Sequence, residues 1–150
     1  MRVRFRKFTD YFKGFEKVEA VRSIFVDETE KVLDNLKVEF ISRKGYMGVS
    51  DEDGHLTVSA KYLRTGNERD IYLDVIHELV HVKQYMVGLT LHDRRFGYTD
   101  RPTEIEAYVH TVKEARRIGM NDPEIFEYLK TEWMTEAEVR KLARTIDVNP

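Results

Sequence analysis

Apolar side chains recur at helical spacing near the start of the chain. Between residues 9 and 36 they return every three or four positions, which is the period of an amphipathic α-helix. Gly14 and the pair Val26-Asp27 are the expected interruptions, because neither favours the interior of a helix. This region therefore predicts one long helix or two joined helices.

Strands are predicted in the next part of the chain. Residues 37–42 are expected to form a first strand. Residues 46–50 and 55–60 alternate apolar and polar side chains on either side of a turn that contains Gly54, which is typical of a β-hairpin. We therefore expect a small mixed β-sheet, and we choose residues 55–60 as its edge strand.

Two longer helices are predicted after the sheet. Asn67 can cap a helix whose apolar residues continue at helical spacing up to Gly88, a natural terminator. Pro102, preceded by Asp100 as the expected cap, opens another helix that runs to about Ile118. The first of the two is apolar around much of its circumference, so we expect it to be buried on several sides.

The C-terminal part is also predicted to be helical. One helix starts at Asp122-Pro123 and is expected to reach about Trp133, and a capping box at residues 135–138 opens another that ends near Ile146. The chain has no internal repeats and no Pro/Gly/Ser-rich linker. The predicted fold class is α+β in a single domain, residues 1–150, with the sheet between N-terminal and C-terminal helices.

The HExxH pentapeptide His77-Glu78-Leu79-Val80-His81 carries the candidate chemistry of the chain. It lies well inside the predicted helix that begins after Asn67, so its two imidazoles share one face, one turn apart, as metal ligands must. Glu78 points about a quarter-turn away and can act as a base without binding the metal. A metal-free alternative is a buried helix in which both histidines are satisfied by hydrogen bonds.

A catalytic zinc usually has three protein ligands, so a third ligand is expected downstream. The HExxHxxGxxH pattern is absent, because Gln84 and Val87 stand where it needs Gly and His. His92 follows the Gly88 helix end and would require the chain to turn straight back. A carboxylate in the first turn of the helix that Pro102 opens is the better candidate, since it can face the two histidines across a helix–helix contact.

The HELVH stretch and the later pattern Glu104-x-x-Ala107 together resemble the gluzincin clan of zinc metallopeptidases, and the short chain is most similar to the minigluzincins. The resemblance covers about residues 55–118. It implies a zincin-like fold and a Zn²⁺ ion on His77, His81 and Glu104, with Glu106 as the fallback ligand. Tyr108 stands where many relatives have an Asp that orients a histidine.

The same resemblance implies hydrolysis of peptide bonds in extended or unfolded polypeptide. Glu78 would take the proton of a water at the metal and pass it to the leaving amine. A further donor normally stabilises the oxyanion, and we rank Tyr98 and His110 ahead of Arg101 and Tyr108 for that role. The substrate would pair with the edge of the sheet through backbone groups. A catalytically silent zinc-binding protein of the same fold, with a regulatory or interaction role, is the alternative.

Composition limits the other possibilities. The net charge is −2 over 150 residues, so neither nucleic acid nor an anionic membrane is expected as a partner. Residues 1–7 are basic, but their alternation suggests a half-exposed strand with a solvated face. With no cysteine, a metal must be bound by His and carboxylate. We expect a cytoplasmic protein without a signal peptide or membrane span, and the oligomeric state is not indicated.

The C-terminal helices have two interpretations. They can simply cover the back of the core. Alternatively, Glu127, Glu132 or Trp133 lies over the cleft as an inhibitory plug, as the resemblance to minigluzincins implies, so that the isolated enzyme is latent.

Overall fold

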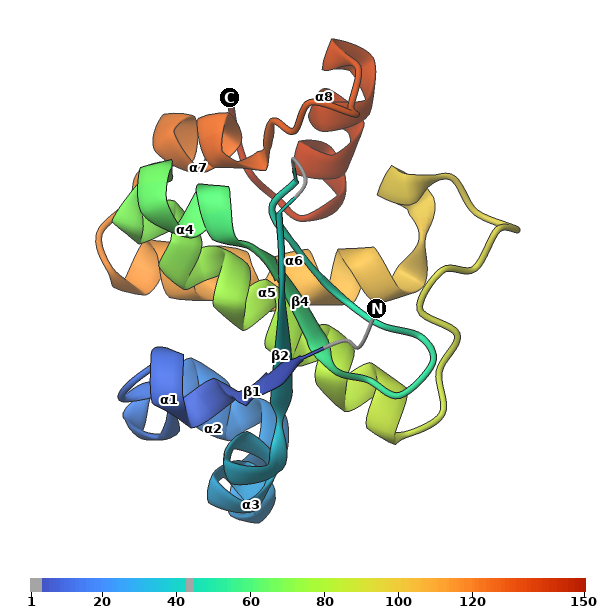
Figure 1. Ribbon diagram of the computed structural model, residues 1–150. Helices are drawn as coiled ribbons and strands as arrows, with labels where there is room; N and C mark the ends of the chain where they lie inside the picture. The colour runs from blue at the N-terminus through green and yellow to red at the C-terminus, as the bar shows by residue number, and fades with distance from the viewer. Residues whose placement is uncertain (1–3, 43–44) are drawn as a thin grey trace.

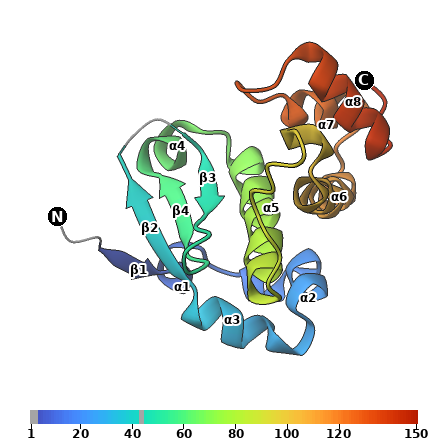
Figure 2. The ribbon, with the colours of Figure 1, turned by 90° about the vertical axis from the view of Figure 1, so that its right-hand side faces the viewer.

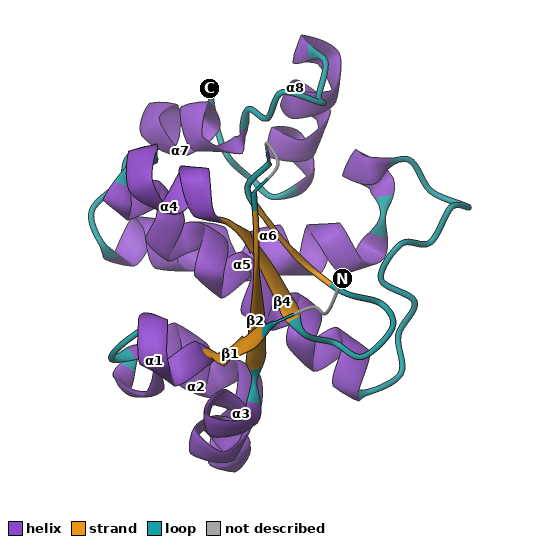
Figure 3. Cartoon of the chain, viewed as in Figure 1, coloured by secondary structure: helices purple, strands orange, loops and turns teal. Residues whose placement is uncertain are grey.

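The computed structural model describes residues 4–42 and 45–150. Helix α5 (Glu68–Met86) lies at the centre, with a four-stranded sheet on one side and helices α6 (Pro102–Arg117), α7 (Asp122–Leu129) and α8 (Glu136–Thr145) on the other (Figures 1 and 2). The strands lie together in one sheet, and helices make up most of the rest of the regular structure, as Figure 3 shows. The fold is therefore mixed α+β, in agreement with the prediction.

The sheet has the strand order β1-β2-β4-β3. Strands β3 (Met47–Val49) and β4 (Leu56–Ser59) pair antiparallel, so the predicted hairpin is confirmed. Strand β4 also pairs in parallel with β2 (Lys37–Ile41), and β2 pairs antiparallel with β1 (Phe5–Lys7). The prediction that residues 55–60 form the edge is therefore wrong. The interior position suits β4, because three of its four residues are buried.

The N-terminal helical region is divided into shorter pieces than predicted. It contains α1 (Phe8–Tyr11), α2 (Glu19–Phe25) and α3 (Thr29–Asn35), separated by single turns of 3₁₀ helix. The interruptions lie where they were expected: Gly14 has φ 84° and Val26 has φ 53°. A positive φ breaks the helical path, and it is uncommon for a β-branched residue. All three residues of β1 are exposed, and residues 1–3 of the predicted N-terminal strand lie outside the described residues.

The two central helices begin and end close to the predicted residues. The Asn67 side chain caps α5 by accepting from two backbone amides, and Gly88 follows its end with φ 85°. Helix α6 spans Pro102–Arg117, but the predicted Asp100 cap is wrong, because Asp100 belongs to a preceding 3₁₀ turn and its carboxylate binds Lys141. A short helix α4 (Ala60–Thr65), capped by the Ser59 side chain, was not predicted.

The last two helices, α7 (Asp122–Leu129) and α8 (Glu136–Thr145), both start with capping boxes. Helix α7 ends earlier than the predicted Trp133, because Lys130 has an extended backbone. These helices bury a second hydrophobic cluster against α6, while the sheet and the N-terminal helices bury a first one against α5. In the described part of the chain, no helix combines the length and the apolar character that crossing a membrane requires.

Candidate metal centre

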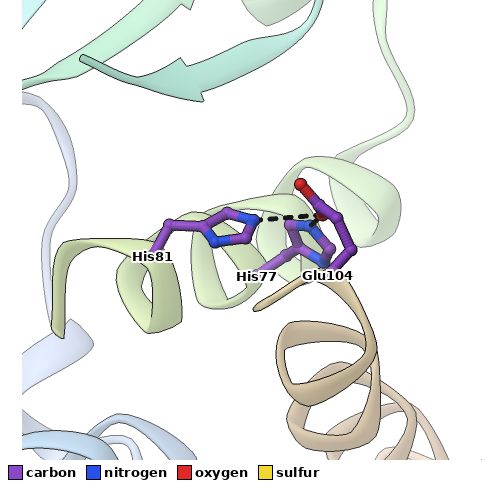
Figure 4. Close-up of side chains that lie close together, drawn as sticks. All are labelled: His77, His81 and Glu104. Carbon is purple, nitrogen blue, oxygen red and sulfur yellow. Dashed lines mark hydrogen bonds and ion pairs between the residues drawn. The ribbon is translucent and has the colours of Figure 1, made fainter. Parts of the chain in front are cut away.

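The two histidines of the HExxH stretch and the first turn of α6 meet at the contact between α5 and α6 (Figure 4). The Oε1 atom of Glu104 lies 3.0 Å from Nε2 of His77 and 3.1 Å from Nε2 of His81. All three side chains are buried. Ala107, one turn after Glu104, is fully buried and has no side chain beyond Cβ to separate the helices.

Gln84 holds the ring of His81 from its other side. The Gln84 Oε1 atom lies 2.7 Å from Nδ1 of His81, and the Gln84 amide nitrogen donates to the carbonyl of Thr103 and to Glu106. Burial disfavours the charged ring, but the hydrogen bond with Glu104 and the charges of Glu78 and Glu104 outweigh it and raise the pKa of His81 to about 9.

His77 lacks a comparable partner. Its Nδ1 atom is buried without a hydrogen-bond partner among the described residues. Its ring instead packs edge-on against Tyr108, with the ring centroids 4.4 Å apart. Tyr108, which stands where many relatives have an Asp, thus packs against this histidine. Among the described residues, Glu104 and packing hold the ring.

The donor atoms of this group fit a metal ion. His77, His81 and Glu104 each offer one ligand atom, and these atoms lie within 4.8 Å of one another. Burial disfavours the charged form of Glu104, but hydrogen bonds from the two histidines hold the pKa of its carboxyl group well below the usual range. Glu104 is therefore an anion. Two imidazole nitrogens and one carboxylate oxygen can bind zinc and several other transition metals. The group could therefore hold a metal ion.

A cavity of about 530 Å³ opens onto these three residues. Glu78 lines it and is partly exposed to it. Desolvation raises the pKa of Glu78 to about 7 in spite of the nearby histidines, which lower it. A carboxyl group with such a pKa can accept a proton near neutral pH and release it again. The cavity thus combines candidate ligands with a candidate base.

The two residues predicted to stabilise an oxyanion differ in position. Tyr98 lines the cavity, and its hydroxyl lies 2.8 Å from that of Tyr108. His110, on α6, is half-exposed and does not contribute to the lining of the cavity. The other two candidates, Arg101 and Tyr108, do line it. Of the two ranked first, only Tyr98 is placed where it can act on a bound substrate.

The structure also places the two alternative metal ligands. Glu106 accepts a hydrogen bond of 2.8 Å from Gln84 and is not part of the ligand group. His92 is exposed at the wall of the cavity and is not part of the group either. Glu104 is therefore the third candidate ligand.

Sequence reasoning named Gln84 only as a departure from another motif and missed its contact with His81. The spacing of three residues on one helix was the available signal, because such residues are neighbours. It also missed Asp74, which lines the cavity and accepts hydrogen bonds from the hydroxyls of Tyr62 and Tyr128. These contacts join segments distant in sequence, so no local pattern indicated them.

The cavity is bordered by β3 and by the segment between α7 and α8. Met47, Gly48 and Val49 of edge strand β3 belong to its lining. So does Trp133, whose ring contacts the rings of Tyr46 and Tyr98.

The residues predicted to form a plug lie near this border. Glu127 lines the cavity together with Trp133, whereas Glu132 accepts a 3.4 Å hydrogen bond from Tyr46. The C-terminal helices therefore serve both to bury a hydrophobic cluster and to bound the cavity.

Comparison of the chain with protein-family models, with curated proteins and with solved structures gives no match in any of the three.

Proposed function

We propose that this chain is a zinc-dependent metalloendopeptidase with a zincin-like fold, which hydrolyses peptide bonds of extended or unfolded polypeptide. The observation that carries the proposal is the convergence of His77, His81 and Glu104 on one point beside Glu78 in an open cavity. The resemblance of the HExxH and Glu-x-x-Ala patterns to gluzincins supports it from the sequence side. A zinc ion held there would supply the Lewis acidity that activates water and polarises the scissile carbonyl.

The residues of the chain then have separate roles. Glu78 takes the proton of the attacking water and delivers it to the leaving amine. Burial raises the pKa of Tyr98 far above its usual value, so its hydroxyl stays protonated and can donate to the developing oxyanion. Strand β3 is an edge of the sheet and lines the cavity, so its free backbone groups can pair with an extended substrate.

The test is Glu78→Gln, which keeps the shape of the side chain and removes the base. Casein cleavage should fall by at least ~10²–10⁴-fold, the usual contribution of a general base, while zinc content stays at the wild-type level. Glu68→Gln changes an exposed carboxylate at the start of the same helix, outside the cavity lining, and is the matched control, with cleavage unchanged. Cleavage that survives Glu78→Gln would show that Glu78 is not the base.

The second candidate is a catalytically silent zinc-binding protein of the same fold with a regulatory or interaction role. The observation in its favour is that Nδ1 of His77, beside Tyr108, has no partner in the described part of the chain, since ligating histidines normally donate this hydrogen bond. It predicts full zinc occupancy with no cleavage of any member of a peptide library. Measurable turnover at full occupancy that Glu78→Gln abolishes excludes this candidate.

We also propose that the wild-type enzyme is latent. Trp133 stands between Tyr46 and Tyr98 at the cavity, where it would restrict entry of a polypeptide. Truncation after Gly119 would remove buried core residues of α7 and α8, so Trp133→Ala is the cleaner variant. It should cleave casein faster than wild type. An unchanged rate in a folded variant with full zinc occupancy contradicts latency through Trp133.

A further inference from the structure

We propose that Gln84 is a positioning residue, which determines the nitrogen that His81 presents to a metal and joins that ring to α6. This inference rests on the metal-binding part of the proposed function and does not depend on peptidase activity. Gln84 is 1% exposed, so each polar atom of its side chain requires a partner within the protein. Its three contacts decide how the amide is oriented.

The amide nitrogen of Gln84 can face only one way. It lies 3.0 Å from the carbonyl oxygen of Thr103 and 2.8 Å from Oε1 of Glu106. A carbonyl and a carboxylate only accept hydrogen bonds, so the nitrogen and not the oxygen must occupy this position. A flipped amide would place oxygen against two oxygens. The Oε1 atom of Gln84 is thereby directed at His81.

This orientation determines the tautomer of His81. An amide oxygen only accepts, so Nδ1 of His81, at 2.7 Å, must carry a proton. In a neutral imidazole the proton on Nδ1 leaves a lone pair on Nε2. In the metal-free protein Nε2 donates to Oε1 of Glu104, at 3.1 Å, and a metal that displaces this proton meets a lone pair directed at the same point. Gln84 thus prepares Nε2 for a metal.

Gln84 also positions the ligand on the facing helix. Thr103 and Glu106 stand on either side of Glu104 in the first turns of α6. One buried side chain therefore contacts one ligand directly and holds the backbone beside another. His77 has no corresponding contact in the described part of the chain, because its Nδ1 is unpartnered there.

The experiment compares the zinc affinity of purified variants by competition with a chromophoric chelator. Gln84→Met keeps a similar length and removes all three hydrogen bonds, so zinc binding should weaken by ~10–100-fold, as for other residues that support a ligand. Lys83→Met, the same substitution at the neighbouring half-exposed position, is the control and should bind as wild type does. Wild-type affinity in Gln84→Met overturns the proposal.

A rescue variant separates positioning from packing. Gln84→Glu combined with Glu106→Gln restores an acceptor for Nδ1 of His81 and reverses the donor and acceptor at the contact with residue 106, while the contact with the carbonyl of Thr103 loses its donor. Zinc affinity should therefore lie between that of Gln84→Met and that of the wild type. NMR of the zinc-loaded protein should show a slowly exchanging Nδ1 proton on His81 in the wild type and the rescue variant, and a faster one in Gln84→Met. A rescue variant as weak as Gln84→Met overturns the proposal.

Two further outcomes are a Gln84→Met variant that does not fold and a wild type that does not bind zinc. If Gln84→Met does not fold, as judged by its circular dichroism, Glu106→Ala replaces it, because residue 106 is exposed and only one partner of Gln84 is lost. Zinc affinity should then fall by less, and an unchanged affinity contradicts the proposal. Failure of the wild type to bind zinc would overturn both this inference and the proposed function, whereas zinc binding without casein cleavage would contradict only the latter.

Discussion

Helix α6 carries two carboxylates that are buried against α5. The two differ in their hydrogen-bond partners. Glu114, near its C-terminal end, has a side chain that is 1% exposed and accepts three hydrogen bonds. Arg117 donates from Nε and Nη2 at 2.6 and 2.8 Å, and the hydroxyl of Tyr72 on α5 donates the third. Both oxygens of Glu114 are thus satisfied by donors that belong to the chain.

Glu104, near the other end of the same helix, is almost as buried, with a side chain that is 8% exposed. Its partners are two imidazoles on a single oxygen, and Gln84 orients the ring of one of them toward that oxygen. Burial alone therefore does not distinguish the two carboxylates. The difference lies in the partners: an arginine and a tyrosine satisfy Glu114, whereas Glu104 meets two imidazole nitrogens, with which it could hold a metal ion.

The largest expected effect concerns zinc affinity, which should depend on Glu104 and not on Glu114. Glu104→Gln keeps the side-chain shape and removes the negative ligand, so zinc affinity should fall by more than the ~10–100-fold that a supporting residue contributes. Glu114→Gln should leave the affinity unchanged. Competition with a chelator measures both. Equal losses in the two variants would mean that the distinction between the carboxylates is wrong.

The next prediction concerns stability, for which the substitution at Glu114, and not the one at Glu104, is the informative one. Glu114→Gln removes the charge that Arg117 pairs with in a buried position, and the free energy of unfolding should fall by about 1–3 kcal/mol. Urea denaturation in the presence of a chelator measures the change, with Glu127→Gln at an exposed position as the control. A Glu114→Gln variant as stable as wild type would show that the pair contributes no net stability. This is the case for many ion pairs with an exposed partner.

Acid should weaken the Glu114 contact. Burial opposes ionisation, but hydrogen bonds from Arg117 and Tyr72 hold the pKa of Glu114 below its ordinary value of 4.5. A group with a lowered pKa stabilises the fold above its ordinary pKa, and this stabilisation is lost as the pH falls through the lowered value. The stability difference between wild type and Glu114→Gln should therefore shrink between pH 7 and strongly acidic solution. A difference that grows on acidification contradicts this.

The features predicted best from the sequence are those set by local spacing. His77 and His81 lie one helical turn apart within a strong apolar pattern, and Glu104 lies in a first turn that Pro102 marks. Their positions within helices required only the period of a helix and its start signals. That Glu104, and not Glu106, faces the histidines came from the resemblance to gluzincins. The structure assigns Glu106 to Gln84.

The features predicted poorly depend on contacts between distant segments. Residues 55–60 alternate like an edge strand, but the parallel pairing of β4 with β2 joins segments that no local pattern connects. The cap at Asp100 was a reasonable local choice, yet Lys141 of α8 competes for the same carboxylate. Helix α4 is a short element whose start depends on the side chain of Ser59. Tertiary contacts decided each of these cases.

The smallest expected effect comes from removing one of the hydrogen-bond donors to Glu114. Tyr72→Phe removes the hydroxyl that joins α5 to Glu114 and keeps the aromatic ring, which stacks on Phe15 with centroids 5.7 Å apart. Because Arg117 still binds both oxygens, the free energy of unfolding should fall by only about 1 kcal/mol, less than in Glu114→Gln. Zinc affinity should not change, since Tyr72 lies outside the ligand group. A loss of zinc binding in the folded Tyr72→Phe variant would mean that the two ends of the α5–α6 contact are coupled, and the comparison between Glu104 and Glu114 would no longer hold.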